Sequence, residues 1–274
     1  NRGGDTAFSA EETYAAHERA VALAREGGFN DLLHRALSLR PALAQRLGRS
    51  VDTDALVAEM RACEGADWNA LQRRTRRNCE NFALYQRGDW TAYAATQRSE
   101  LRLQLEAGDD YHAWLVAHRL ALAAIACGRP AEAMAVMRPA VESIRAQGFQ
   151  RQCWQQVALL VVACIESGDA TAAQVHEAVR LMRGANAIDW MASHLALWLT
   201  QRSRWADAAR LLGWLARRQA QSGGPVDAPS QAAQERARSA LTRAADGKQI
   251  GGWHAQGERW VDDDVAEALL GVDV

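Results

Sequence analysis

The sequence predicts an all-α protein, a right-handed helical solenoid in which antiparallel helix pairs stack one after another. Helix-forming residues dominate, above all alanine, leucine, arginine, glutamate and glutamine, and apolar residues recur at spacings of three and four. The sequence contains no sustained alternation of valine, isoleucine and threonine of the kind that indicates a strand. The helical stretches are also interrupted at nearly regular intervals, which is typical of solenoids.

Residues 1–65 are predicted to form helices that are degenerate members of the array. Three helical stretches are expected there, at residues 9–28, 29–48 and 52–63. Ser9 and Glu12 suit a capping box that opens the first stretch, and two glycines end it. Pro41 is expected to interrupt the second stretch, because proline lacks the N–H group that a helix interior needs.

Residues 66–221 are predicted to form helix-hairpin repeats. The breaks RGDWTAY, CGRPAEA, SGDATAA and RSRWADA begin at Arg87, Cys127, Ser167 and Arg202, which stand 40, 40 and 35 residues apart. Three of the breaks contain a glycine that suits the end of a helix, namely Gly88, Gly128 and Gly168. Asp89 and Asp169 are expected to cap the helices that follow, and Pro130 to occupy a first turn.

The residues around these breaks also match in register. Ala121, Val161 and Ala196 stand seven residues before the turn residue, and Ala133, Ala173 and Ala208 stand five after it. Small residues at such positions let paired helices approach closely. In this respect the chain resembles a tetratricopeptide-like repeat, most closely in LALAAIACGRPAEAMAVMRPAV.

The end of the chain carries a second resemblance. WADAARLLGWLARRQAQSGG, at residues 205–224, resembles the AARLLG segment that closes many bacterial regulators of the signal-transduction ATPase class, often joined to a winged-helix or LuxR-type DNA-binding domain. A tryptophan–glycine ending typical of that class is roughly matched by residues 252–270 at Trp253, Gly257, Val261 and Ala266, and Trp260 departs from it. Residues 222–274 are therefore expected to be helices that cap the solenoid.

This resemblance implies a regulatory or sensor domain of a bacterial transcriptional regulator. The ATPase and DNA-binding modules of that class would lie upstream if the chain is a fragment. The competing hypothesis is a stand-alone scaffold protein that binds peptides in its concave groove. Because folds of this kind serve many roles, the sequence leaves both open.

No pattern in the sequence predicts catalysis. It contains no nucleophile elbow, dinucleotide fingerprint or kinase signature, and Gly247–Lys248 lacks the glycine spacing of a phosphate loop. The seven histidines are scattered, so no metal or cofactor is expected. Asp262, Asp263 and Asp264 are interpreted as capping residues of a short helix rather than cation ligands. The chain is predicted not to be an enzyme.

Charge and hydropathy limit the kinds of partner that the chain is expected to bind. A net charge of −1 provides no field that attracts nucleic acid directly, and the longest apolar run, residues 157–165, is shorter than the ~20 residues that a membrane span needs. The five cysteines form no C-x-x-C pair, which indicates reduced thiols and a cytoplasmic location. A protein, a peptide or an apolar small-molecule effector is the expected partner.

A candidate site for that partner follows from one face of the first helices of the repeats. An apolar stripe there, with a few polar side chains that could orient a ligand, is formed by Leu115, His118, Leu122, Ile125, Val162, Ile165, Trp190, Ser193, Leu197 and Thr200. A large apolar stripe is not left exposed to water in a soluble protein. Three alternatives remain for what covers it. The chain's own tail folds back on it, with or without a homodimer contact; a peptide or partner helix lies there; or an apolar small molecule binds.

Overall fold

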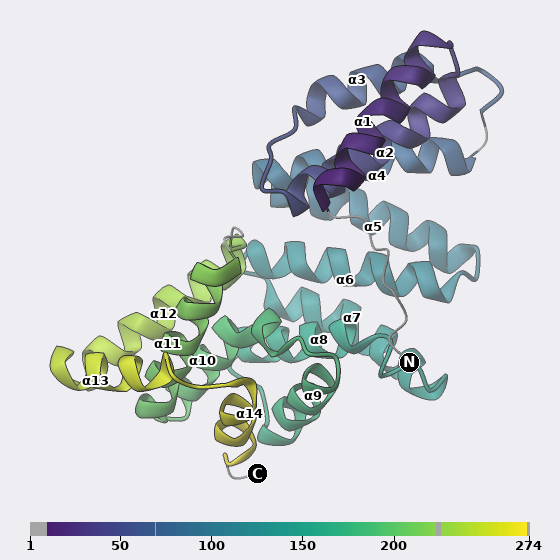
Figure 1. Ribbon diagram of the computed structural model, residues 1–274. Coiled ribbons are helices and arrows are strands. Elements are labelled where there is room, and N and C mark those ends of the chain that lie inside the picture. Colours follow the sequence, from purple (N-terminus) through teal and green to yellow (C-terminus); the bar gives the residue numbers. More distant parts are fainter. Residues whose placement is uncertain (1–9, 69, 223–225, 273–274) are drawn as a thin grey trace, which may run out of the picture. The chain divides into compact units, whose positions relative to one another are not determined.

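The structure is a computed structural model that describes residues 10–68, 70–222 and 226–272. All regular elements within these ranges are helices and none is a strand, which confirms the all-α prediction. Within each unit most successive helices pack against one another, as α1 with α2 and α6 with α7 do, an arrangement compatible with a helical solenoid (Figure 1). Backbone contacts divide the chain into two compact units, residues 1–93 and 94–274. The division into 1–65, 66–221 and 222–274 stays a prediction about the repeats.

The first unit has a small core. Its helices are α1 (Ala10–Glu26), α2 (Asn30–Arg46), α3 (Thr53–Cys63) and α4 (Ala70–Arg87), followed by the start of α5 (Trp90–Glu106). Leu37 and Met60 are completely buried between these helices, and His34 packs edge-on against the ring of Trp68. This unit therefore has a hydrophobic cluster of its own.

The second unit contains the larger core. Beyond α5 its elements are α6 (Asp110–Ala126), α7 (Pro130–Ala146), α8 (Trp154–Ser167), α9 (Ala172–Gly184), the 3-10 helix η1 (Ile188–Met191), α10 (Ala192–Gln201), α11 (Trp205–Ser222), α12 (Ala228–Ala244), α13 (Gly247–Gly257) and α14 (Asp262–Leu270). Pairs that follow one another in the chain, such as α6 with α7 and α10 with α11, make extensive contacts. Trp198 and Trp214 are fully buried between alanine-rich helices.

Glycines in the left-handed conformation follow seven of the described helices. Their φ angles lie between +63° and +84°, at Gly28, Gly48, Gly88, Gly108, Gly128, Gly148 and Gly168. The predicted helix ends at Gly88, Gly128 and Gly168 are thus confirmed. The other four glycines reveal a shorter period of 20 residues, which corresponds to one helix and its turn. The spacing of the sequence breaks predicts only the 40-residue period of a helix pair. A left-handed residue without a Cβ reverses the chain at little steric cost.

Several capping predictions are confirmed. As predicted, the side chain of Asp89 accepts a hydrogen bond from the backbone N–H of Ala92 at 3.1 Å. Asp52, for which no cap was predicted, accepts one from Ala55 at 3.0 Å. Pro130 is the first residue of α7, and Asp264 accepts the N–H of Val261 at the start of α14. Ser9, the expected capping residue of α1, lies outside the described residues.

Two predictions about helix positions are wrong. Helix α2 continues through Pro41, because this residue is buried in the hairpin and packing compensates for one missing backbone hydrogen bond. Asp169 does not cap α9; Thr171 does, in a capping box with Gln174. The turn after Gly168 is two residues longer than the turn after Gly128.

Because of that longer turn, one predicted packing position is also wrong. Ala173 is exposed, whereas Ala133 at the matching position of α7 is completely buried. Helix α9 begins at Ala172, four residues after Gly168, whereas α7 begins two residues after its glycine. Counting from the turn therefore places Ala173 on the wrong side of its helix. Ala121, Ala196 and Ala208 are completely buried as expected.

The C-terminal helices are joined to the array by a close helix crossing. Gly213 of α11 faces the backbone carbonyl of His254 in α13, and Gly257 faces the backbone of Arg210 in α11. A Cβ atom at either glycine would overlap main-chain atoms of the opposite helix. Both glycines lie in the C-terminal segments at residues 205–224 and 252–270, and the crossing provides a physical reason for them.

We expect Gly257→Ala to lower the free energy of unfolding by about 2 kcal/mol or more, because overpacking against backbone costs at least as much as overpacking against side chains. Chemical denaturation of the purified chain measures this. Gly252→Ala in the same helix is the matched control, since a Cβ there meets no atom within 4 Å. It should leave stability unchanged or raise it by up to about 1 kcal/mol. Equal effects of the two substitutions would contradict the close crossing.

Candidate functional site

The ten residues predicted to line a binding site lie on neighbouring elements of the second unit. Helix α8 packs against both α6 and α10, and η1 precedes α10 directly. We call the surface formed by these ten residues the predicted face. Six of them are buried, namely Ile125, Val162, Ile165, Ser193, Leu197 and Thr200, and four are partly exposed, namely Leu115, His118, Leu122 and Trp190. The predicted face therefore has a buried and an open part.

Helix α12 covers residues of the buried part. It packs along α10 and also contacts α11 and α6 (Figure 1). Its inward side is formed by small residues: Ala233 and Ala237 are completely buried, and Leu241 is 2% exposed. Small side chains let α12 approach α10 closely. The chain's own C-terminal segment thus shields this part from water.

A buried hydrogen bond connects α12 to the predicted face. The amide Nε2 of Gln234 donates to the hydroxyl of Ser193 at 3.0 Å, and both residues are about 5% exposed or less. The amide oxygen of Gln234 accepts a hydrogen bond from Arg238 at 3.0 Å. Ser193 therefore already has a partner on α12. The hydroxyl of Thr200, another predicted ligand-orienting group, donates to the carbonyl of Leu197 within α10 at 2.6 Å.

An ion pair joins α12 to α8 beside this hydrogen bond. Arg236 donates from Nη2 to both carboxylate oxygens of Glu166, at 2.6 and 2.7 Å. His194 of α10 is 4% exposed, and its Nε2 lies 3.5 Å from Glu166. Burial lowers the pKa of His194, and this effect outweighs the nearby carboxylate, which raises it. A neutral imidazole next to the Glu166–Arg236 pair leaves that pair with balanced charge.

The open part of the predicted face is aromatic. Trp190 lies between two other rings, with its centroid 5.8 Å from that of His118 and 5.8 Å from that of Trp154, whose plane is nearly perpendicular. Trp154 is the first residue of α8 and is not among the ten residues predicted from the sequence. Its position at the start of a first helix, like that of Trp190 near α10, is the signal that could have assigned it to this site.

His118 provides the polar atom of the open part. Burial and, to a lesser extent, the charge of Arg119 lower its pKa to about 4, so the imidazole is neutral at pH 7. Its Nδ1 is buried and has no hydrogen-bond partner in the described part of the chain. Such an atom is costly when it stays unpaired. The open part therefore combines apolar surface with one unsatisfied nitrogen.

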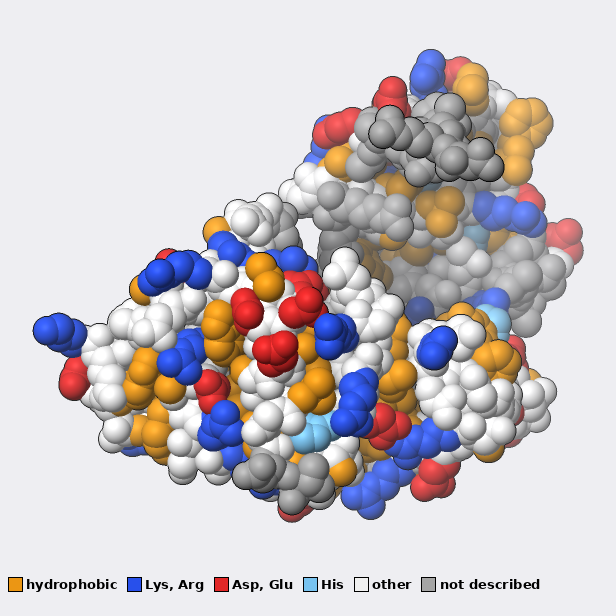
Figure 2. Space-filling model, turned by 60° about the horizontal axis from the view of Figure 1, so that its bottom comes forward, with side chains coloured by type: hydrophobic (Ala, Val, Ile, Leu, Met, Phe, Trp, Pro, Cys, Tyr) orange, Lys and Arg blue, Asp and Glu red, His pale blue; other side chains and the backbone are white. Residues whose placement is uncertain are grey.

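Other kinds of site find little support in the described ranges. They contain no group of three or more histidine, cysteine, aspartate or glutamate side chains that could hold a metal ion. No helix among these residues is both long and apolar enough to cross a membrane. All five cysteines are unpaired, and only Cys127 is more than slightly exposed. On the face that Figure 2 shows, acidic and basic side chains are interspersed.

Comparison with known proteins assigns no family or function to this chain. No protein-family model, curated protein or solved structure matches the chain.

We expect the free energy of unfolding to decrease as the pH falls from about 6.5 toward 4. The pKa of His118 is about 4 in the folded chain and near 6.5 when exposed, so protonation favours the unfolded state over this window. The stabilising contribution is fully present above pH 6.5 and is lost toward pH 4. NMR titration of the imidazole measures the pKa directly, and denaturation of His118→Gln should show a smaller pH slope. A pKa near 6.5 in the folded chain would contradict the burial of this ring.

The hydrogen bond between Gln234 and Ser193 should hold α12 in place. Ser193→Ala leaves a buried amide unpaired, and we expect a loss of about 1–3 kcal/mol in unfolding free energy together with faster hydrogen exchange in α12. A double-mutant cycle with Gln234→Ala isolates the pairwise contribution. Ser239→Ala, at an exposed position of the same helix, is the control. Strictly additive effects of the two substitutions would show that the hydrogen bond contributes nothing to docking.

Proposed function

We propose that this chain is the regulatory or sensor domain of a bacterial transcriptional regulator. It mediates a protein–protein interaction or binds an effector through the open part of the predicted face. The observation that carries this proposal is the composition of that part, in which partly exposed leucine and tryptophan side chains occur together with His118, whose Nδ1 has no partner among the described residues. Binding sites commonly combine apolar and aromatic walls with a few polar atoms.

The chemistry of the open part specifies what it accepts. Leu115, Leu122 and the two tryptophans offer apolar and aromatic contacts, so the partner or effector presents an apolar group. A hydrogen-bonding group on the ligand pairs with His118 and removes the cost of its unpaired nitrogen. A charged group has no counterpart there, because His118 is neutral at pH 7.

The position of α12 couples binding to the rest of the domain. This helix contacts α6, which carries part of the open part, and also α11 and α13. A ligand that binds more tightly to one arrangement of α12 shifts the population of that arrangement. In a bacterial regulator this shift acts on the attached ATPase and DNA-binding modules in the cytoplasm. The resemblance of residues 205–224 to such regulators motivates this part of the proposal.

A stand-alone scaffold that binds peptides is the second candidate. The observation that favours it is α12 itself, a helix bound across the predicted face through alanines, one amide and one arginine. A partner helix with similar side chains could occupy the same kind of surface. The complete reading frame that encodes this chain distinguishes the two candidates. A phosphate loop and DNA-binding helices upstream support the regulator, and their absence supports the scaffold.

Native mass spectrometry of the purified chain tests for an effector. We expect an extra noncovalent mass in the native spectrum that is lost on unfolding. Trp190→Ala should abolish it, because this ring joins His118 and Trp154. Trp205→Ala, a partly exposed tryptophan of α11 outside the predicted face, should retain it. A clean monomer mass contradicts effector binding, and a clean dimer shows that a second chain is the partner.

A further inference from the structure

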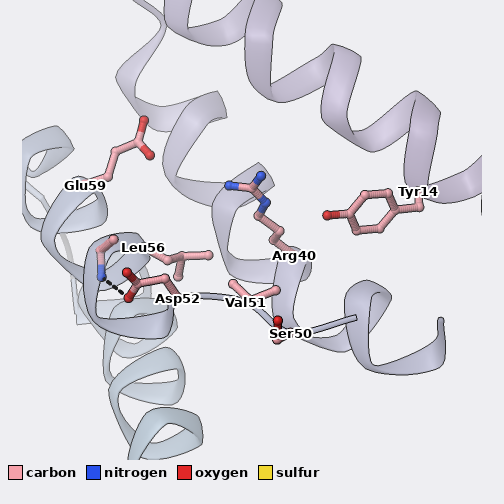
Figure 3. Close-up of a pocket in the computed structure, with 8 residues that line it drawn as sticks. Tyr14, Arg40, Ser50, Val51, Asp52, Leu56 and Glu59 are labelled. Atoms are coloured by element: carbon pink, nitrogen blue, oxygen red, sulfur yellow. Dashed lines mark hydrogen bonds between the residues drawn. The ribbon is translucent and has the colours of Figure 1, made fainter. Parts of the chain in front are cut away.

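The first unit contains a pocket that is separate from the predicted face. It has a volume of about 260 Å³ and lies between α1, α2, the segment at residues 50–52 and α3 (Figure 3). Polar groups that line it include Tyr14, Arg40, Ser50, Asp52 and Glu59. Pockets for drug-sized ligands usually measure about 300–1,000 Å³, so this pocket suits a smaller molecule.

Arg40, the positively charged residue of the pocket, is paired with a carboxylate that lies outside the pocket. Arg40 donates from Nη2 to Glu18 of α1 at 2.8 Å. Burial acts to lower the pKa of Arg40, but the neighbouring Tyr14 and Glu18 outweigh it and raise the pKa, so the guanidinium stays charged. This group has five N–H donors, and one ion pair does not use them all. Arg40 can therefore keep Glu18 while it binds a second anion.

Tyr14 is fixed in position beside Arg40. Its ring is covered by the guanidinium of Arg49, which lies 4.8 Å from the ring centroid and is itself paired with Glu11 at 2.8 Å. Figure 3 shows the Tyr14 hydroxyl pointing toward the Arg40 side chain. A tyrosine hydroxyl and a guanidinium that converge in this way are suited to a carboxylate.

The two acidic residues of the pocket, Asp52 and Glu59, also accept hydrogen bonds from the surrounding protein. Both hydrogen bonds from Arg25 to Glu59 go to the same oxygen, Oε1, at 2.9 and 2.7 Å. Asp52 uses Oδ1 to cap α3 by accepting the N–H of Ala55. The second oxygen of each carboxylate takes no part in these bonds. Side chains that are locked by partners outside a pocket are pre-organised for a ligand, which reduces the entropy that binding costs.

The atoms behind the pocket indicate missing hydrogen-bond partners. Arg40 Nε, Glu18 Oε1 and His17 Nε2 are buried and have no hydrogen-bond partner in the described part of the chain. Unpaired polar atoms are uncommon in folded proteins, and three of them gather at the α1–α2 interface beside this pocket. A polar ligand that reaches Arg40 Nε supplies one of these three missing partners.

We propose that this pocket binds a small zwitterion, a free α-amino acid. Its carboxylate lies against Arg40 and Tyr14, and its ammonium group against Asp52 and Glu59. In the view of Figure 3, Tyr14 lies on one side of Arg40 and the two acidic residues lie on the other. Val51 and Leu56 contribute apolar surface for the side chain of the ligand. A simple anion or a simple cation satisfies only one half of the pocket.

Calorimetric titration of the full chain tests this inference. L-leucine, L-lysine and L-glutamate are the probes, and 4-methylpentanoate and isopentylamine are controls that each lack one charged group of leucine. We expect at least one amino acid to bind with a dissociation constant of about 1 mM or tighter. The two one-charge controls should bind at least about tenfold more weakly, because each forfeits one charge-assisted contact.

Two variants locate the bound amino acid. Glu59→Gln and Tyr14→Phe should each weaken binding by about tenfold or more, whereas Glu26→Gln should not change it, because Glu26 is an exposed residue of α1 outside the pocket. Thermal unfolding confirms that each variant is folded. The two substitutions test different contacts, since Glu59 binds the ammonium group and Tyr14 the carboxylate. No saturable binding of any amino acid, equal affinity for a one-charge control, or unchanged affinity in both variants overturns the proposal. These outcomes leave the function proposed for the second unit unaffected.

Discussion

The fold depends on the chain reversing direction after helices of nearly equal length. Six of the described helices contain 17 residues, and five of these, α1, α2, α5, α6 and α7, end close to a left-handed glycine. At a rise of about 1.5 Å per residue these helices are about 25 Å long. Because paired helices match in length, their apolar faces stay opposed along the whole hairpin, and alanines at the crossings allow close approach.

The regular spacing ends after Gly168, and the predicted face owes its form to that change. Left-handed turns continue at Asn186 and Ser203, which are not glycines and break the 20-residue period. Helices α9 and α10 have only 13 and 10 residues. With a shorter α10, α12 packs across the same helix that carries Ser193 and Leu197. The departure from regularity therefore separates the buried part of the predicted face from the open part.

Local features of this fold could be predicted from the sequence, and long-range ones could not. Gly88 and Asp89 mark a turn and a cap that involve only neighbouring residues. Ala173 was misplaced because the length of one turn shifts everything counted from it. Gln234 gives no local sign of its buried partner Ser193, since polar residues on an arginine-rich helix predict exposure. The Tyr14–Arg40 pocket joins four segments of the chain, and no spacing in the sequence relates them.

Helix α12 is positioned more by its polar contacts than by apolar burial. Ala233 and Ala237 on its inward side bury little apolar area each, and Leu241 is the largest apolar side chain buried there, so apolar packing defines the position of α12 along α10 only loosely. Gln234 and Arg236 fix the position of α12 along α10. Each pairs with one particular residue, Gln234 with Ser193 of α10 and Arg236 with Glu166 of α8. The cap at Asp227 fixes where α12 begins, and the glycine crossing of α13 with α11 fixes the chain that follows. An effector that disturbs Glu166 or Ser193 thus acts on the register of α12 rather than on the core.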